Sequence, residues 1–137
     1  MITLDAVTTT VVRLSDLDAQ CIVSHLTRPG SEFQAEVLAR KSDTPVAIVR
    51  THEERIAAWA ATHYWRGMQT LEGFTSLGAR RRGMARVAAA MLVAEGHIDP
   101  YRTLAVFSPL CVSLASSVGC RDVRLYQRHG DDWIENS

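Results

Sequence analysis

Three consecutive arginines precede a predicted helix, and they are the first residues whose types suggest chemistry. Arg80, Arg81 and Arg82 are followed by Gly83 and by an apolar pattern at helical spacing. Cations at the start of a helix oppose its dipole and cost about 0.3–1 kcal/mol each when exposed. Free N–H groups, a glycine that lets a ligand approach the main chain and surplus positive charge together favour a bound polyanion. A solvated turn is the alternative, since charge runs are usually only solvated.

Two titratable side chains upstream of this turn could move protons. Glu72 lies in the middle of a predicted strand, and a carboxylate can take a proton from an amine. His63 lies on the neighbouring predicted strand, and imidazole titrates at about pH 6.5. Each residue could instead have no catalytic role. Glu72 would then be an exposed polar position of a half-buried strand, and His63 would be a hydrogen-bonded strand residue. Glu72 is the first candidate for a catalytic base, and His63 is the second.

Cys111 could act as a thiol nucleophile that carries an acyl group, but a structural role is favoured. It falls within an apolar helical pattern that needs small residues, and buried cysteines are usually inert. With Cys21 and Cys120 it makes an odd count without Cys-x-x-Cys spacing, so we interpret all three as reduced, buried thiols. Histidines in predicted loops make no metal-ligand spacing with cysteines or acids, and we predict no metal site. These are His52, His97 and His129.

The elements that position these residues follow from the spacing of apolar side chains. Strands are expected at residues 2–14, 45–50, 55–65, 68–77, 103–107, 121–128 and 133–135. Helices are expected at residues 15–26, 31–41, 84–95 and 109–118. Residues 55–65 contain four alanines, so a helix is the alternative there, but Trp59, Tyr64 and Trp65 favour a strand.

Two of the expected helices have clear boundary signals. The helix at residues 84–95 is amphipathic and is followed by Gly96, where a left-handed cap is typical. Its expected buried stripe is Met84, Val87, Ala88, Met91 and Leu92. Ser108 and Pro109 begin the helix at residues 109–118 as N-cap and first helical residue. Its expected buried stripe is Leu110, Val112, Leu114 and Val118.

The order of these elements, β-α-α-β-β-β-α-β-α-β-β, predicts the fold class. Antiparallel strands followed by β-α-β-α-β make an α/β chain with a mixed, mostly antiparallel central sheet and helices on both faces. The chain of 137 residues is expected to form one domain that buries roughly two-thirds of its unfolded surface.

Two sequence blocks resemble one known superfamily. Residues 80–85, Arg-Arg-Arg-Gly-Met-Ala, fit the pattern [Gln/Arg]-x-x-Gly-x-[Gly/Ala] between a strand and a helix. This is similar to the acyl-CoA pyrophosphate loop of the Gcn5-related N-acetyltransferase (GNAT) superfamily. In the second block, Ser108-Pro109 stands at the superfamily's Asn-Pro-like helix start, and Gly119-Cys120 stands at its Gly-Phe helix end. The resemblance covers roughly residues 55–135.

The resemblance implies an acetyl-CoA-dependent N-acetyltransferase that transfers the acetyl group directly to an amine of a small molecule or a protein. It implies that Arg80, Arg81, Arg82, Gly83, Met84 and Ala85 hold the pyrophosphate. It also implies that backbone N–H groups of Phe74, Thr75 and Ser76 bind the acyl donor where the fourth and fifth strands splay, with Ser108 nearby. The acceptor would be set by residues 15–43 and 129–132, whose composition does not identify it.

One departure from the superfamily pattern affects catalysis. Ala115 stands where many members carry the tyrosine that protonates the departing CoA thiolate. Ser116 and Ser117 are poor substitutes for a phenol with a pKa of about 10. Three alternatives stay open: water protonates the thiolate or it leaves unassisted, another group such as Tyr126 serves, or the chain is a non-catalytic module that binds acyl-CoA or a partner.

Composition excludes several other classes of function. The formal net charge is zero, and no basic stripe with interleaved aromatic residues is present, so a nucleic-acid partner is disfavoured. The start of the sequence does not resemble a signal peptide, and no apolar run approaches the ~18 residues of a membrane span. We therefore expect a cytoplasmic protein that binds neither nucleic acid nor membrane. Its oligomeric state stays open, a homodimer included.

Overall fold

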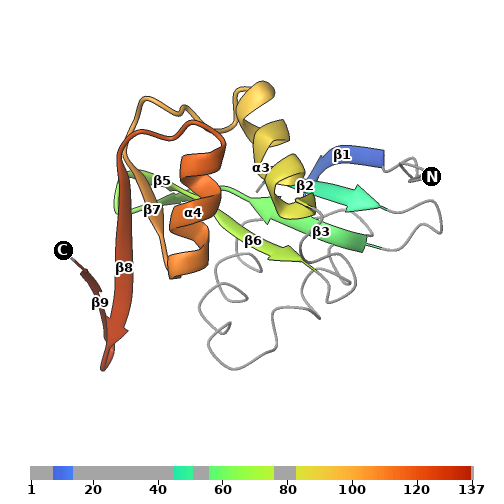
Figure 1. Cartoon of the computed structure of the whole chain (residues 1–137). Coiled ribbons are helices and arrows are strands. Elements are labelled where there is room, and N and C mark those ends of the chain that lie inside the picture. Colours follow the sequence, from blue (N-terminus) through green and yellow to red (C-terminus); the bar gives the residue numbers. More distant parts are fainter. Residues whose placement is uncertain (1–7, 14–44, 51–55, 76–82, 137) are drawn as a thin grey trace.

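A computed structural model describes residues 8–13, 45–50, 56–75 and 83–136 of the chain. The strands in these ranges are β1 (Thr8–Arg13), β2 (Pro45–Arg50), β3 (Ile56–Ala61), β4 (Tyr64–Trp65), β5 (Met68–Thr70), β6 (Glu72–Thr75), β7 (Leu104–Val106), β8 (Val123–His129) and β9 (Asp132–Glu135). The helices are α3 (Met84–Ala94) and α4 (Pro109–Ser117), as Figure 1 shows. The helices expected at residues 15–26 and 31–41 lie outside the described residues.

The strands form two hydrogen-bonded sheets instead of the single sheet expected. One has the order β1-β2-β3-β6 and is antiparallel throughout. The other has the order β4-β5-β7-β8-β9, with β5, β7 and β8 parallel and both edges antiparallel. A single hairpin, residues 56–75, contributes two strands to each sheet. The expected mixed and mostly antiparallel strand arrangement is confirmed.

This hairpin breaks at two places where the sequence predicted continuous strands. The strand expected at residues 55–65 stops after β3 and resumes at β4, and the strand expected at residues 68–77 divides at Leu71. At the break, the N–H of Thr70 donates to the carbonyl oxygen of His63 at 2.9 Å, whereas the N–H of Leu71 donates to the carbonyl oxygen of Ala105 at 3.2 Å. The two N–H groups therefore point to opposite sides of β5, and after Leu71 the chain leaves β7 and enters β6 of the other sheet.

Small residues explain why the alanine-rich segment is a strand and not the alternative helix. Ala57, Ala58, Ala60 and Ala61 are at most 2% exposed, and α3 packs directly over β2 and β3. In Figure 1, α3 and α4 lie on the same side of the two sheets, and the two helices contact each other. The methyl side chains leave room for α3 to approach the strand backbone closely.

The buried face of α3 differs in part from the predicted stripe. Met84, Ala88 and Leu92 are buried as expected, but Val87 is 40% exposed, and the prediction at Val87 is wrong. The stripe turns toward Ala89 instead, which is fully buried. Ala88 and Ala89 are adjacent in the sequence and both are buried. The buried face of α3 is therefore wider than the stripe that spacings of three and four residues predict.

Replacing Leu92 with alanine is expected to lower the free energy of unfolding by about 2–5 kcal/mol, because its fully buried side chain would leave a cavity under α3. Val87→Ala, on the exposed side of the same helix, provides the control and is expected to change stability by no more than about 0.5 kcal/mol. Urea unfolding of both variants measures the difference. Equal effects would contradict the packing of α3 on the sheet.

The start of α4 agrees with the sequence prediction, and Val112, Leu114 and Val118 pack against the core as expected. The side chain of Ser108 caps the helix by accepting the N–H of Cys111 at 3.3 Å, and Pro109 begins the helix. Leu110 was expected in the buried stripe, but it is 83% exposed, so that prediction is wrong. The helix buries Ala115 instead, and Cys111 is half-buried one turn before it.

Candidate active site

β5 and β6 continue one another along the chain but have different neighbours on the side of β7. Gln69 and Thr70 pair in parallel with Leu104 and Ala105, and the N–H of Leu71 still reaches the oxygen of Ala105. After Leu71, the described pairing of β6 is with β3, and none joins β6 to β7. The two strands therefore diverge at this point, as the resemblance implied for the fourth and fifth strands.

Glu72 is the first residue after this divergence, and it is buried. Its side chain is 4% exposed, and neither carboxylate oxygen has a hydrogen-bond donor among the residues that the structure describes. Removal from water raises the pKa of Glu72 from 4.5 to about 8, because burial penalises the charged form. The exposed surface position considered for this residue is wrong. Glu72 is buried, lies where the two strands diverge, and has a pKa close to neutrality. A group that exchanges protons near neutral pH needs such a pKa.

Gly73 allows α4 to approach β6 next to Glu72. A Cβ atom on Gly73 would lie 3.2 Å from Cδ2 of Leu114 and 3.4 Å from the carbonyl oxygen of Trp59. Cys111 lies three residues before Leu114 on α4, and burial raises the pKa of its thiol. A glycine inside a strand is typical of such a close backbone approach.

The hydrogen bond of Leu71 indicates where the N–H groups of β6 point. The N–H of Leu71 donates to Ala105 of β7, so two residues later the N–H of Gly73 also points away from β3. Successive N–H groups of a strand alternate sides, so the N–H of Thr75 also points away from β3. The same alternation directs the N–H of Phe74 toward β3. Of the three donors predicted in this segment, the pairing favours Thr75, and Ser76 lies outside the described residues.

His63 faces Thr70 across the hairpin, beside Glu72. The Nδ1 atom of His63 lies 2.9 Å from Oγ1 of Thr70, and that oxygen also contacts the N–H of His63 at 3.3 Å and its carbonyl oxygen at 3.2 Å. If the hydroxyl donates to the carbonyl oxygen, Nδ1–H donates to the hydroxyl, and the lone pair of the neutral ring is on Nε2. This arrangement uses all three contacts. Since Ala61 pairs with Glu72, His63 is the diagonal neighbour of Glu72 on the hairpin.

The start of α3 contains three of the predicted pyrophosphate residues. Gly83 precedes the helix with φ 68°, a left-handed conformation that favours glycine, and as N-cap residue it has no side chain to cap the first turn. Met84 is buried and Ala85 is half-buried at the first two helical positions. Arg80, Arg81 and Arg82 lie outside the described residues, so their placement at the helix start stays a prediction.

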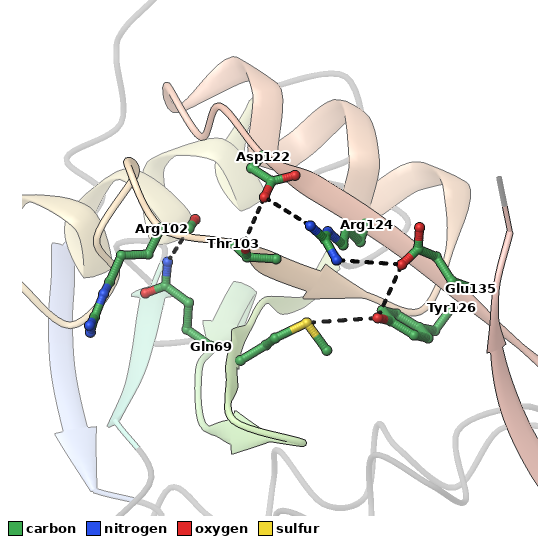
Figure 2. Close-up of polar contacts among 8 residues, drawn as sticks. Gln69, Arg102, Thr103, Asp122, Arg124, Tyr126 and Glu135 are labelled. Atoms are coloured by element: carbon green, nitrogen blue, oxygen red, sulfur yellow. Dashed lines mark hydrogen bonds and ion pairs between the residues drawn. The ribbon is translucent and has the colours of Figure 1, made fainter.

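Tyr126, one alternative proton donor to a leaving thiolate, is held in a network on the five-stranded sheet. Its hydroxyl donates to Oε1 of Glu135 at 3.3 Å, as Figure 2 shows. The same oxygen lies 3.8 Å from Sδ of Met68. Arg124 links Glu135 to Asp122 in the same view, at 3.8 and 3.6 Å. The Tyr126 hydroxyl donates to the carboxylate of Glu135 and so links β8 to β9.

Sequence reasoning found Glu72 and His63 but missed the residues around them. The structure places Gly73, the neighbour of Glu72 on β6, against Leu114 of α4, and Ser108 caps the same helix. Gly73 interrupts a β-branched and aromatic pattern, which is the signal that could have revealed the close approach of α4. Among the described residues, no group of histidines, cysteines and acids could hold a metal ion. The same residues contain no helix long and apolar enough to cross a membrane.

Comparison of the whole chain with solved structures identifies the fold. The chain is similar to an aminoglycoside acetyltransferase, meta-AAC0020, from an uncultured soil metagenomic sample, with a TM-score of 0.51 at 10% identity over 82% of this chain and 86% of that chain. It is the GNAT fold. A ribosomal-protein-alanine N-acetyltransferase from Brucella melitensis biovar Abortus 2308 matches with a TM-score of 0.49 at 16% identity over 82% of this chain and 87% of that chain. No family model matches the chain, and no curated protein matches it in sequence.

The GNAT fold confirms the superfamily resemblance at the level of architecture. In GNAT terms, β5 and β6 together form the fourth strand of the predicted order and β7 forms the fifth. Glu72 therefore lies at the splay of the GNAT sheet, and Gly83 lies at the start of the helix that follows.

Proposed function

We propose that this chain is an N-acetyltransferase that transfers an acetyl group from acetyl-CoA to an amine. The observation that carries the proposal is the buried carboxyl of Glu72, 4% exposed and with no donor among the described residues, at the divergence of β6 from β7. Burying a carboxyl without a partner costs stability, so its presence favours a role in binding or proton transfer. The GNAT fold supports acyl transfer as the type of reaction.

In this proposal Glu72 is the base for the acceptor. An amine is mostly protonated at neutral pH, and only its neutral form attacks a carbonyl carbon. Glu72, with a pKa of about 8, can accept a proton from an ammonium group and release it again near neutral pH. His63 is the second candidate for the same role, since its ring is the diagonal neighbour of Glu72 on the hairpin.

The residues present fit acetyl-CoA as the donor, which would supply an activated thioester. The N–H of Thr75 points away from β3 and is available to a carbonyl oxygen or to the main-chain-like pantetheine arm. The start of α3 offers N–H groups that its N-cap residue, Gly83, does not cap, and three arginines precede this glycine in the sequence. The acceptor is proposed to be an amine of a small molecule or a protein, in a cytoplasmic, single-domain enzyme.

A non-catalytic acyl-CoA-binding module is the second candidate function, and the position of Ala115 favours it. Ala115 is fully buried, so the residue at the superfamily's tyrosine position presents only a methyl group. Measuring free thiol with acetyl-CoA and a panel of amines separates the two functions. An enzyme releases thiol in the presence of an accepted amine, whereas a module binds acetyl-CoA without releasing thiol.

Gly83→Asp is expected to weaken acetyl-CoA binding at least tenfold, or about 1.4 kcal/mol, because the new carboxylate would face the phosphates at the start of α3. Gly96→Asp is the matched control. Gly96 has a similar positive φ, 78° against 68° for Gly83, and a Cβ atom at either glycine has nothing within 4 Å. Calorimetric titration measures both variants. No binding by the wild type, or equal losses in both variants, would contradict the site at the start of α3.

A further inference from the structure

The side chain of Glu72 and the helix α4 lie on opposite faces of β6. A Cβ atom on Gly73 would meet Leu114 of α4, so the side chain of Glu72, one residue earlier, projects from the face away from α4. Thr70 lies two residues before Glu72 and shares this face, and its partner on β7 is Ala105. An amine that gives its proton to Glu72 therefore reaches the carboxyl from this face of the sheet.

Phe107 stands across the splay from Glu72. Thr70 pairs with Ala105, and Phe107 follows Ala105 by two residues, as Glu72 follows Thr70. The two side chains therefore lie at the same level and on the same face, one on each side of the point where β6 leaves β7. Phe107 is partly exposed, so its ring offers an apolar surface to the part of an acceptor that adjoins its amine.

Phe107 belongs to an aromatic cluster that consists of Trp65, Phe107, Tyr126 and Trp133. The ring of Phe107 meets those of Trp65 and Trp133 edge to face, with ring centroids 5.1 and 5.2 Å apart. Trp65 meets Tyr126 in the same way at 4.9 Å. Trp65 pairs with Met68, an even number of residues before the buried carboxyl, so the aromatic cluster lies on the face of that carboxyl. Edge-to-face contacts fix the orientation of each ring.

Arg66 holds β9 against the aromatic cluster. Its guanidinium lies 4.3 Å over the ring of Trp65, and it donates to Oδ1 of Asp132 and to the carbonyl oxygen of Trp133, each at 3.0 Å. β4 and β9 are the two edges of the five-stranded sheet, so these contacts join one edge to the other. Arg66 also has a positive φ of 51° in the turn with Gly67, where asparagine or glycine is preferred. Such strain persists where the surrounding structure requires it.

The charges on this face favour an acceptor with one amine and an apolar body. Neither carboxylate oxygen of Glu72 has a donor among the described residues. The described carboxylates of β9 already have cationic partners, since Asp132 pairs with Arg66 and Glu135 pairs with Arg124. An acceptor with several ammonium groups would leave the additional charges without partners, whereas an aliphatic or aromatic body packs on phenyl and indole rings.

We infer that the acceptor is a primary amine whose aliphatic or aromatic body packs on Phe107, and that Arg66 is the positioning residue for this ring. The inference names the substrate class for the proposed function and rests on it. The ammonium group lies against Glu72, and the apolar body crosses the splay to Phe107. Because β9 carries Trp133 against Phe107, Arg66 acts on the acceptor through β9 and does not contact it.

Initial rates with a panel of amines test the substrate class. Hexylamine is compared with cadaverine, a diamine of the same length in which an ammonium group replaces the terminal methyl group, and with phenethylamine. With acetyl-CoA saturating, kcat/KM for hexylamine and phenethylamine is expected to exceed that for cadaverine by about tenfold or more. Equal values, or a preference for cadaverine, overturn the inference and leave the proposed function intact. Absence of thiol release with every amine removes both.

Two variants test the roles of Phe107 and Arg66. Phe107→Ala is expected to raise KM for hexylamine about tenfold or more and to remove its advantage over cadaverine, with acetyl-CoA affinity unchanged. Arg66→Asn removes the guanidinium but suits the positive φ, so it is expected to raise KM for hexylamine about 3- to 10-fold with kcat changed less than about twofold.

Arg121→Asn is the matched control for Arg66→Asn. The guanidinium of Arg121 lies 4.6 Å over the ring of Tyr101, outside the aromatic cluster, so its loss is expected to change neither KM nor kcat. Urea unfolding of the three variants shows that each is folded under the assay conditions. Unchanged selectivity in Phe107→Ala overturns the inference. A KM in Arg66→Asn equal to that of Arg121→Asn overturns the positioning role.

Discussion

Glu72→Gln is expected to make the protein more stable than the wild type at pH 8 and to change its stability little at pH 5. The pKa of Glu72 is raised from 4.5 to about 8 by burial, so between these values the folded protein keeps a proton that the unfolded chain releases. The folded state then binds more protons than the unfolded state, and stability falls as pH rises. Each pH unit corresponds to about 1.4 kcal/mol, which gives a loss on the order of 5 kcal/mol by pH 8.

Urea unfolding at several pH values between 5 and 8 measures this effect. The neutral amide of the variant has no charged form, so the contribution of position 72 becomes independent of pH. The measurement at pH 5 is the internal control, because the wild-type carboxyl is then mostly protonated and resembles the amide in shape. A wild-type protein whose advantage over the variant grows from pH 5 to pH 8 would mean that Glu72 is paired when charged.

Much of the described fold follows from local signals in the sequence. The boundaries of α3 and α4 agree with the glycine and serine–proline signals within one or two residues, because caps depend on a few neighbouring groups. The exposed positions of Val87 and Leu110 do not follow from the sequence. Which side of a short helix is buried depends on the sheet it meets, and local apolar spacing does not contain that information.

The candidate site was predictable by residue type and not by environment. Glu72 was identified because a carboxyl in mid-strand is chemically suggestive, but its burial depends on the break at Leu71, where one N–H bonds to β7 and the chain then leaves that strand. No local pattern marks this break. The close approach of Leu114 to Gly73 joins residues 41 positions apart in the sequence, and only the packing of α4 on β6 creates it.

A residue that destabilises the fold has a functional role when its replacement stabilises the protein and abolishes its activity. Buried carboxyls without partners are expensive, and sites of proton transfer are where such a cost is commonly found. The isosteric amide removes the charge and keeps the shape. Stability and activity should therefore change in opposite directions in Glu72→Gln, whereas a purely structural role predicts that they change together.

Glu72→Gln is accordingly expected to lower kcat/KM for acetyl transfer about 10²- to 10⁴-fold, since an amide cannot accept the ammonium proton. In the wild type, kcat/KM should rise with pH and level off above about pH 8, where Glu72 is ionised in the free enzyme. The variant should lose this rise while binding acetyl-CoA as the wild type does. Initial rates across the pH range, with acetyl-CoA affinity measured separately, provide the comparison.

His63→Gln is the variant that distinguishes the two candidate bases. It removes the titrating ring but keeps a polar side chain beside Thr70, whose Oγ1 lies 2.9 Å from Nδ1 of His63. If Glu72 is the base, this variant should retain the rise of kcat/KM toward pH 8, with a smaller loss of rate than Glu72→Gln. If the rise disappears in His63→Gln and persists in Glu72→Gln, the proton passes through the imidazole. The buried carboxyl would then serve to bind the ammonium group of the acceptor.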